Sequence, residues 1–270
     1  MLRRLLILLF ALGPPAMAAA TDPIRLPDGL KQGGSAKAVE IIDGDTLALD
    51  DGRQVRLVGL QAPKLPLDRP GFKTWPLASE SKAALERLAL GRRLSLHYGG
   101  REIDRHRRLL AHLVDAETGV WIQGTMLAQG MARVYTFKDN RSVIPEMLAL
   151  ERAARAVRRG IWAHPYYAVR TPETVAHDVD SFQIVEGTVR AVALRKGKTF
   201  LNFGADWRSD FTVLVEGRDA KAFRDAGLSL NDLEGRRIRV RGWVKSWNGP
   251  LIEATHPEQI ETAGLGPAAR

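Results

Sequence analysis

The sequence predicts an α+β protein built from two small β-barrels, the first of which carries packed helices. Short β-rich runs recur along the 270-residue chain between Gly, Pro and Asp turns, and long amphipathic helices are few. The strand and helix candidates also fall into two groups, divided by a linker at residues 166–180. We therefore expect one domain over residues 36–165 and a smaller, strand-dominated domain over residues 181–262.

The N-terminus has the features of an export signal. Residues 1–20 begin with MLRR, continue with the apolar run LLILLFAL and end in small residues around AMA. The apolar run is interrupted at Gly13 and Pro14, too early to span a membrane. We expect residues 1–20 to be a signal peptide, residues 21–35 a flexible lead-in and residues 263–270 a tail. The mature protein is then exported, either to the periplasm or as a secreted protein.

The first domain alternates strands and helices. AVEIIDGDTLAL and QVRLVGL read as a hairpin closed by an Asp-Gly turn. An Ala/Leu-rich amphipathic helix follows Ser79 and stops at Gly91, and RRLSLHY and RLLAHLV are further strands. A short helix ends at Gly130, ARVYTF is the next strand, and Pro145 opens the last helix, where a missing backbone N–H costs little.

The second domain contains five strand candidates and one helix candidate. The strands are IVEGTVRAVAL, KTFLNFG, FTVLVEG, RRIRVRGWVKSW and LIEATHPEQIE, and the helix is AKAFRDAG. This content fits an oligonucleotide-binding (OB) barrel, although periodicity alone indicates only an all-β domain. Trp207, Trp243 and Trp247, with Phe203, are candidates for a base-stacking platform. The alternative is an aromatic core with a rigid turn at Trp247.

The charge distribution favours a polyanionic partner for the first domain. The chain carries a formal charge of +9, and residues 36–170 hold 22 Lys/Arg against 15 Asp/Glu. Residues 178–262 are balanced, with 13 of each. The chain has no cysteine, so its stability cannot come from disulfides.

Five ordered segments of the first domain carry a family resemblance. DGDT, RLVGLQAPK, DRHRRLLAHL, LAQGMARVY and GIW, in this order, resemble the staphylococcal nuclease (thermonuclease-like) family over residues 36–165. The resemblance implies a five-stranded OB-type barrel with three helices, and calcium-dependent phosphodiester hydrolysis of DNA and RNA. The second domain resembles the OB-fold domains that are often appended to thermonuclease-like proteins in bacteria.

The resemblance also implies roles for individual residues. Asp45 matches a calcium-ligand aspartate, and Asp43 lies two residues before it. Arg56 matches the arginine that binds the scissile phosphate, and Arg108 matches a second phosphate-binding arginine, with Arg107 as the alternative. Guanidinium groups suit this task because each can bind two phosphate oxygens at once and can stabilise the negative charge of the transition state.

Two positions depart from the family pattern, which ends this stretch in Asp-Ala-Pro-Glu or Asp-Thr-Pro-Glu. Gln61 stands where a second metal-ligand aspartate is expected and removes one negative charge from the site. Lys64 stands where the glutamate that activates water is expected. An ammonium has no lone pair to accept a proton, repels a dication and attracts phosphate. The sequence therefore predicts phosphate binding by Arg56, Arg108 and Lys64, and a Ca²⁺ site that is weak or lost.

Three functions follow from these observations. The first is an exported protein that binds nucleic acid or another phosphate-bearing polyanion through a degraded catalytic site. The second is an active calcium-dependent nuclease, in which Asp43, Asp68 or Glu80 substitutes for the missing acids. The third is a periplasmic scaffold in which both barrels bind protein.

Overall fold

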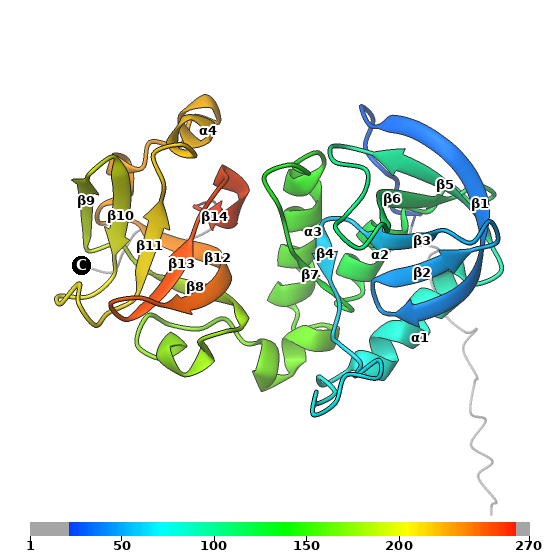
Figure 1. The fold of residues 1–270 in the computed structure, drawn as a ribbon, viewed down its shortest axis with the longest axis horizontal. Helices are drawn as coiled ribbons and strands as arrows, with labels where there is room; N and C mark the ends of the chain where they lie inside the picture. The colour runs from blue at the N-terminus through cyan, green and yellow to red at the C-terminus, as the bar shows by residue number, and fades with distance from the viewer. Residues whose placement is uncertain (1–21, 263–270) are drawn as a thin grey trace, which may run out of the picture.

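The computed structural model describes residues 22–262, which form two β-rich lobes with a helix between them (Figure 1). The predicted signal peptide and the predicted tail at 263–270 lie outside the described residues. Separate clusters of buried apolar side chains fill the two lobes.

The first lobe is a closed barrel with the strand order β1-β2-β3-β6-β5. Its strands are β1 (Lys31–Asp43), β2 (Thr46–Leu49), β3 (Gln54–Leu57), β5 (Arg93–Tyr98) and β6 (Leu109–Asp115). β1 pairs antiparallel with both β2 and β5 and so closes the barrel, whereas β3 and β6 are parallel. Alternate apolar side chains point inward along these strands, as the hydrophobic pattern predicts. The predicted barrel with packed helices is confirmed.

Three helices pack on this barrel: α1 (Ala78–Ala89), α2 (Ile122–Ala128) and α3 (Ile144–Ala156). α1 begins just before Ser79, and Gly91 beyond its end has the left-handed φ of 77° that favours glycine. Pro145 lies in the first turn of α3, as expected. Figure 1 shows α3 on the side of the barrel that faces the second lobe.

The structure corrects two expectations for the first lobe. β1 begins at Lys31, inside the expected flexible lead-in, because the backbone of KQGGS pairs with β5 although its side chains lack an alternating pattern. The expected strand ARVYTF is reduced to β7 (Arg133–Val134), which pairs with β4 (Leu60–Gln61) outside the barrel. The backbone N–H of Val134 donates to the Glu151 carboxylate of α3, so no strand pairs on that edge.

The second lobe is a seven-stranded sheet with one short helix, α4 (Ala220–Asp225). Its strands are β8 (Phe182–Thr188), β9 (Ala191–Arg195), β10 (Lys198–Asn202), β11 (Thr212–Val215), β12 (Arg237–Ser246), β13 (Pro250–Glu253) and β14 (Ile260–Glu261). The order runs β14-β12-β13-β11-β10-β9, and β8 also pairs with β12. β8 leads almost directly into β9 along the chain, although β8 pairs with β12 and β9 pairs with β10.

Short 3-10 helices complete the connections. They are η1 (Gly160–Ala163), η2 (Pro165–Tyr167), η3 (Val175–Asp178), η4 (Asn231–Leu233) and η5 (Pro257–Gln259). η2 and η3 lie in or next to the expected linker, and their residues Tyr167 and Val175 are buried. The Tyr167 hydroxyl donates to the carbonyl of Pro76 at 2.6 Å, so the connection is packed against the first lobe.

A buried charged cluster joins the two lobes. Arg241 of β12 is 1% exposed and donates to both carboxylate oxygens of Glu151 on α3, at 2.9 and 3.0 Å. It also donates to the carbonyl of Val134 at 3.1 Å and to Glu261 of β14. An arginine buried with two carboxylates holds its partners in a defined geometry, so the network fixes β12 against α3 and β7.

Within residues 22–262, no helix has the length and apolar character that crossing a membrane requires.

Candidate functional site

The predicted acids lie in the tight turn that joins β1 to β2. Asp43 and Asp45 are 3% and 0% exposed, and the backbone N–H of Asp45 donates to Asp43 Oδ1 at 3.0 Å. Gly44 between them lies against α1: a Cβ at this position would overlap the side chain of Ser81 and come within 2.7 Å of Ala62 Cβ. Only glycine lets this turn approach the helix so closely, and the approach buries both carboxylates.

The side chain of Lys64 reaches between these two carboxylates. Its Nζ lies 2.6 and 2.7 Å from the two carboxylate oxygens of Asp45 and 3.1 Å from Asp43 Oδ2. The Lys64 side chain is 18% exposed. The ammonium therefore contacts both acids from the position in which a bound cation would lie.

Arg56 of β3 approaches Asp45 from another direction. Its Nη1 lies 3.1 Å from Asp45 Oδ1 and donates to the carbonyl of Leu57 at 3.1 Å, while Nη2 donates to the carbonyl of Leu60 at 2.9 Å. The pairing of Thr46 with Arg56 across β2 and β3 places this side chain beside the acidic turn. Arg56 is thus held in one orientation before any ligand arrives.

The two acids respond differently to this environment. Burial alone would raise the pKa of Asp45, but Arg56 and Lys64 outweigh it and hold that pKa well below its usual range. Burial raises the pKa of Asp43, and the neighbouring Asp45 carboxylate adds to the rise, while Lys64 only partly offsets it. Asp45 is therefore the firmly ionised member of the pair.

The side chain of Gln61 is hydrogen-bonded to Arg133 and not to the acidic turn. Its Oε1 accepts hydrogen bonds from Arg133 Nε at 3.0 Å and Nη2 at 2.8 Å, and both side chains are buried. The register of β4 and β7, in which Gln61 faces Arg133, creates this contact. Sequence reasoning missed Arg133, although an arginine inside the apolar run MARVYTF is a signal of a buried charge.

The residues present do not fit a calcium ion. Formal charges of Asp43, Asp45, Arg56 and Lys64 cancel, and a dication would have to displace the Lys64 ammonium from two carboxylates. The Gln61 carbonyl is already occupied. In the described part of the chain, no group of three or more His, Cys, Asp or Glu side chains is arranged to hold a metal ion.

Of the three predicted substitute acids, Asp43 is the one that forms an ion pair in this site among the described residues. Asp68 and Glu80 are both exposed, and among the described residues neither forms an ion pair with Arg56 or Lys64. Asp43 does reach the site, but it is paired with Lys64.

A pocket of about 500 Å³ extends from Arg56 and contains Arg108. Arg108 is oriented by Asp104, which accepts from its Nε at 2.8 Å. Arg107, the alternative, lies in the turn with a φ of 67° and does not line this pocket. The pocket also has basic and aromatic lining residues, which are Arg101, Arg105, His106, Tyr135, Phe137 and Trp243. Asp104, Asp139, Asn140 and several aliphatic residues complete the lining, so the basic side chains outnumber the two carboxylates. The structure therefore brings the two predicted phosphate-binding arginines together.

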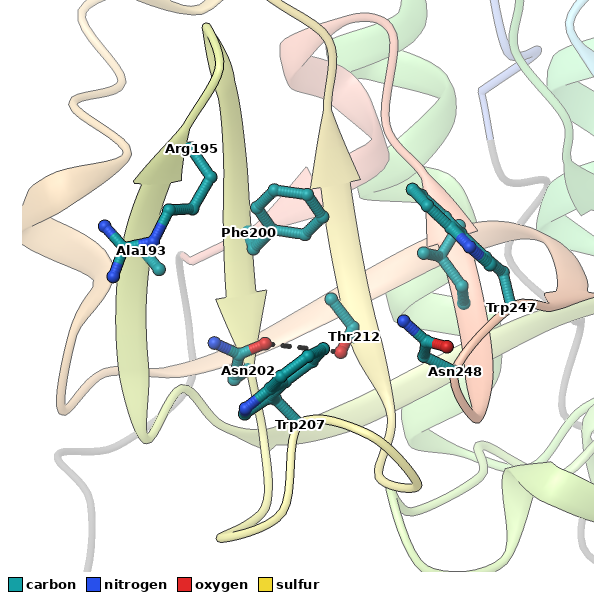
Figure 2. A pocket seen from close by; sticks show the side chains of 9 residues that line it. Ala193, Arg195, Phe200, Asn202, Trp207, Thr212, Trp247 and Asn248 are labelled. Carbon is teal, nitrogen blue, oxygen red and sulfur yellow. Dashed lines mark hydrogen bonds between the residues drawn. The ribbon is translucent and has the colours of Figure 1, made fainter.

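The predicted tryptophan platform is divided between two places. Trp207 and Trp247 line a different pocket, of about 440 Å³, together with Phe200 and Asn202 on the second lobe (Figure 2). Trp243 lies instead in the pocket of Arg56 and Arg108, although it belongs to β12 of the second lobe. The three tryptophans are therefore not one surface, because Trp243 faces the first lobe.

Comparison with known proteins agrees with the barrel. A model of the staphylococcal nuclease homologue family matches residues 54–164. A thermonuclease of Staphylococcus hyicus is 26% identical over 136 residues, which are 47% of this chain and 75% of that protein. The protein ParB of Escherichia coli is 31% identical over 140 residues, 48% of this chain and 73% of its own.

An uncharacterized endonuclease of Escherichia coli O157:H7 is 30% identical over 130 residues, which are 47% of this chain and 76% of that protein. The fold and the site define an OB-type barrel in which two arginines line one pocket. The chain belongs to the staphylococcal nuclease homologue family.

Proposed function

We propose that this protein binds single-stranded nucleic acid or a similar phosphate-bearing polyanion without a divalent metal, and that its catalytic site is degraded. The observation that carries the proposal is the Lys64 ammonium, which lies within 2.6 to 3.1 Å of three carboxylate oxygens of Asp43 and Asp45. It takes the place of both a metal and a general base. Family membership and relatives named as a thermonuclease and an endonuclease support nucleic acid as the ligand class.

Arg56 and Arg108 supply the phosphate contacts. Both line one pocket, and each is held in place, Arg56 by backbone carbonyls and Arg108 by Asp104. Guanidinium groups that are already oriented lose little conformational entropy when a phosphate binds. Hydrolysis would also need a group that takes a proton from water, and the ammonium at position 64 has no lone pair for that proton.

The expected export of the protein belongs to the same proposal. It is supported by the charged, apolar and small-residue segments of residues 1–20. A phosphate-binding protein outside the cytoplasm would meet nucleic acid released from other cells.

A binding titration tests the proposal. A fluorescently labelled single-stranded DNA is titrated with the mature protein in EDTA, at several salt concentrations. We expect binding that strengthens steeply as salt falls, because affinity for a polyanion comes largely from released counterions. Arg56→Ala should weaken binding and reduce the slope of log K against log salt by about 0.7, the value for one phosphate contact on a single strand.

The matched control is Arg87→Ala, which removes an exposed arginine from α1 outside the pocket. It should leave the affinity and the slope unchanged. The same DNA is then incubated with Ca²⁺. Cleavage that disappears in Arg56→Ala would establish the active nuclease instead, and absence of binding even at low salt would favour a protein-binding scaffold.

A further inference from the structure

We infer that the two lobes form one binding groove, in which Trp243 of the second lobe stacks on a base next to the phosphate held by Arg56 and Arg108. This inference rests on the proposed function and names the part of the ligand that the second lobe recognises. It assigns to the second lobe a direct role in binding single-stranded nucleic acid.

The direction of Trp243 follows from strand geometry. Successive side chains of a β-strand point to opposite faces, so Arg241 and Trp243 lie on the same face of β12. Arg241 is buried against Glu151 and Val134 of the first lobe. Trp243, two residues further along, must therefore face the first lobe too, and it lines the pocket that contains Arg56 and Arg108.

A second contact fixes the position of this face. Trp243 is opposite Phe182 in the pairing of β12 with β8. The ring of Phe182 packs edge-on against the ring of Tyr135, with 4.8 Å between the ring centroids. The Arg133 guanidinium lies 4.7 Å from the Phe182 ring centroid. Arg133 in turn donates to Gln61. Phe182, the strand partner of Trp243, is thus linked through Arg133 to Gln61 in the first lobe.

The chemistry of the pocket indicates a base beside a phosphate. Trp243 and Phe137 are 47% and 51% exposed, so large aromatic faces are open to a ligand. Arg105 also lines the pocket, and among the described residues it forms no ion pair with a carboxylate. Aromatic faces beside guanidinium groups suit single strands, whose unpaired bases can stack while their phosphates bind the cations.

The experiment compares two labelled probes of the same length and charge, a thymidine oligonucleotide and a chain of abasic sugar-phosphate units. Trp243→Ala should weaken binding of the thymidine probe by about 5- to 30-fold, the lower part of the range for stacking on one aromatic side chain, because Trp243 is half exposed. Binding of the abasic probe should not change. Trp243→Phe should keep most of the affinity, and Leu194→Ala, an exposed apolar control on β9, all of it.

The outcomes separate this inference from the proposed function. If Arg56→Ala weakens both probes and Trp243→Ala weakens neither, the polyanion site stands and the shared groove is wrong. If Trp243→Ala weakens both probes equally, it acts through the structure of the lobe interface and not through a base, and the inference is also overturned. If the wild-type protein binds neither probe at low salt, the proposed function and the inference fail together. Melting temperatures of all variants establish that each is folded.

Discussion

Replacing Lys64 with methionine tests the central feature of the site. Methionine keeps much of the length and apolar surface of the lysine stem but removes the ammonium that contacts Asp43 and Asp45. Asp45 then keeps the Arg56 guanidinium, whereas Asp43 loses the ammonium that is its ion-pair partner. We expect Lys64→Met to destabilise the protein because an uncompensated buried charge is costly.

The magnitude follows from the burial of the partners. Removing one member of a fully buried ion pair costs about 3 to 5 kcal/mol. Here Lys64 is 18% exposed and Asp45 keeps Arg56, so we expect a loss of about 2 to 3 kcal/mol in the free energy of unfolding. For a chain of this size that loss corresponds to a fall in Tm of about 4 to 12 °C. Lys73→Met, at an exposed lysine, should change Tm very little.

The pH dependence gives a second readout with a definite sign. The pKa of Asp43 is already raised in the folded protein, and loss of the ammonium raises it further. A carboxyl group whose pKa is higher in the folded than in the unfolded protein binds a proton more readily when folded. The destabilisation that its buried charge causes therefore disappears as the pH falls. The stability difference between Lys64→Met and the wild type should therefore be largest near pH 7 and should shrink toward pH 4.

Denaturant unfolding at pH 7 and pH 4 measures the difference in the free energy of unfolding, and thermal melts with and without Ca²⁺ measure the effect of the metal. Calcium should raise the Tm of Lys64→Met, in which no ammonium competes for Asp43 and Asp45, and should leave the Tm of the wild type unchanged. Equal stabilities of Lys64→Met and the wild type at pH 7 would refute the ion pairing. Stabilisation of the wild type by Ca²⁺ would refute the substitution of an ammonium for the metal.

Three further substitutions test the rest of the structure. Arg241→Met removes one of the two arginines that Glu151 and Glu261 share, and Arg155 remains as the other. It should cost about 2 to 4 kcal/mol in urea unfolding, and a loss below about 1 kcal/mol would contradict the buried network. Gly44→Ala should destabilise by about 1 to 3 kcal/mol in a thermal melt, because the added methyl overlaps Ser81; unchanged stability would mean that the turn has room. Burial holds the pKa of His256 at about 4, so the wild type should lose stability as the pH falls from about 6.5 toward 4, where the unfolded chain binds a proton more readily. His256→Gln, which can still bond Thr136, should lose less over this range, and an equal loss would show that His256 is not responsible.

Most of the barrel could be predicted because its signals are local. Alternating apolar residues mark β2, β3, β5 and β6, and Ala/Leu periodicity marks α1. The start of β1 was missed because KQGGS pairs through its backbone alone and has no side-chain pattern to read. A strand of this kind is defined by its partner, which lies more than 50 residues away in the sequence.

The site was predictable in its residue types but not in its contacts. Asp45, Arg56 and Arg108 were identified from sequence, and the structure brings Arg56 close to Asp45 and into one pocket with Arg108. Arg133 was missed because its partner Gln61 is 72 residues away. In RRIRVRGWVKSW, the valines are buried in the second lobe, whereas Arg241 and Trp243 face the first lobe, and no local pattern indicates that second contact.

The amino-acid sequence by itself determined the two β-rich lobes and the replacement of two expected acids by Gln61 and Lys64. Only the tertiary structure decided where those replacements lie, with Gln61 bound to Arg133 and the Lys64 ammonium between two carboxylates. Only the tertiary structure, too, turned Trp243 toward the arginines of the other lobe. The physical reason is that hydrophobic periodicity depends on residues that are close in the sequence. Ion pairs and shared pockets depend on segments that meet only when the chain has folded.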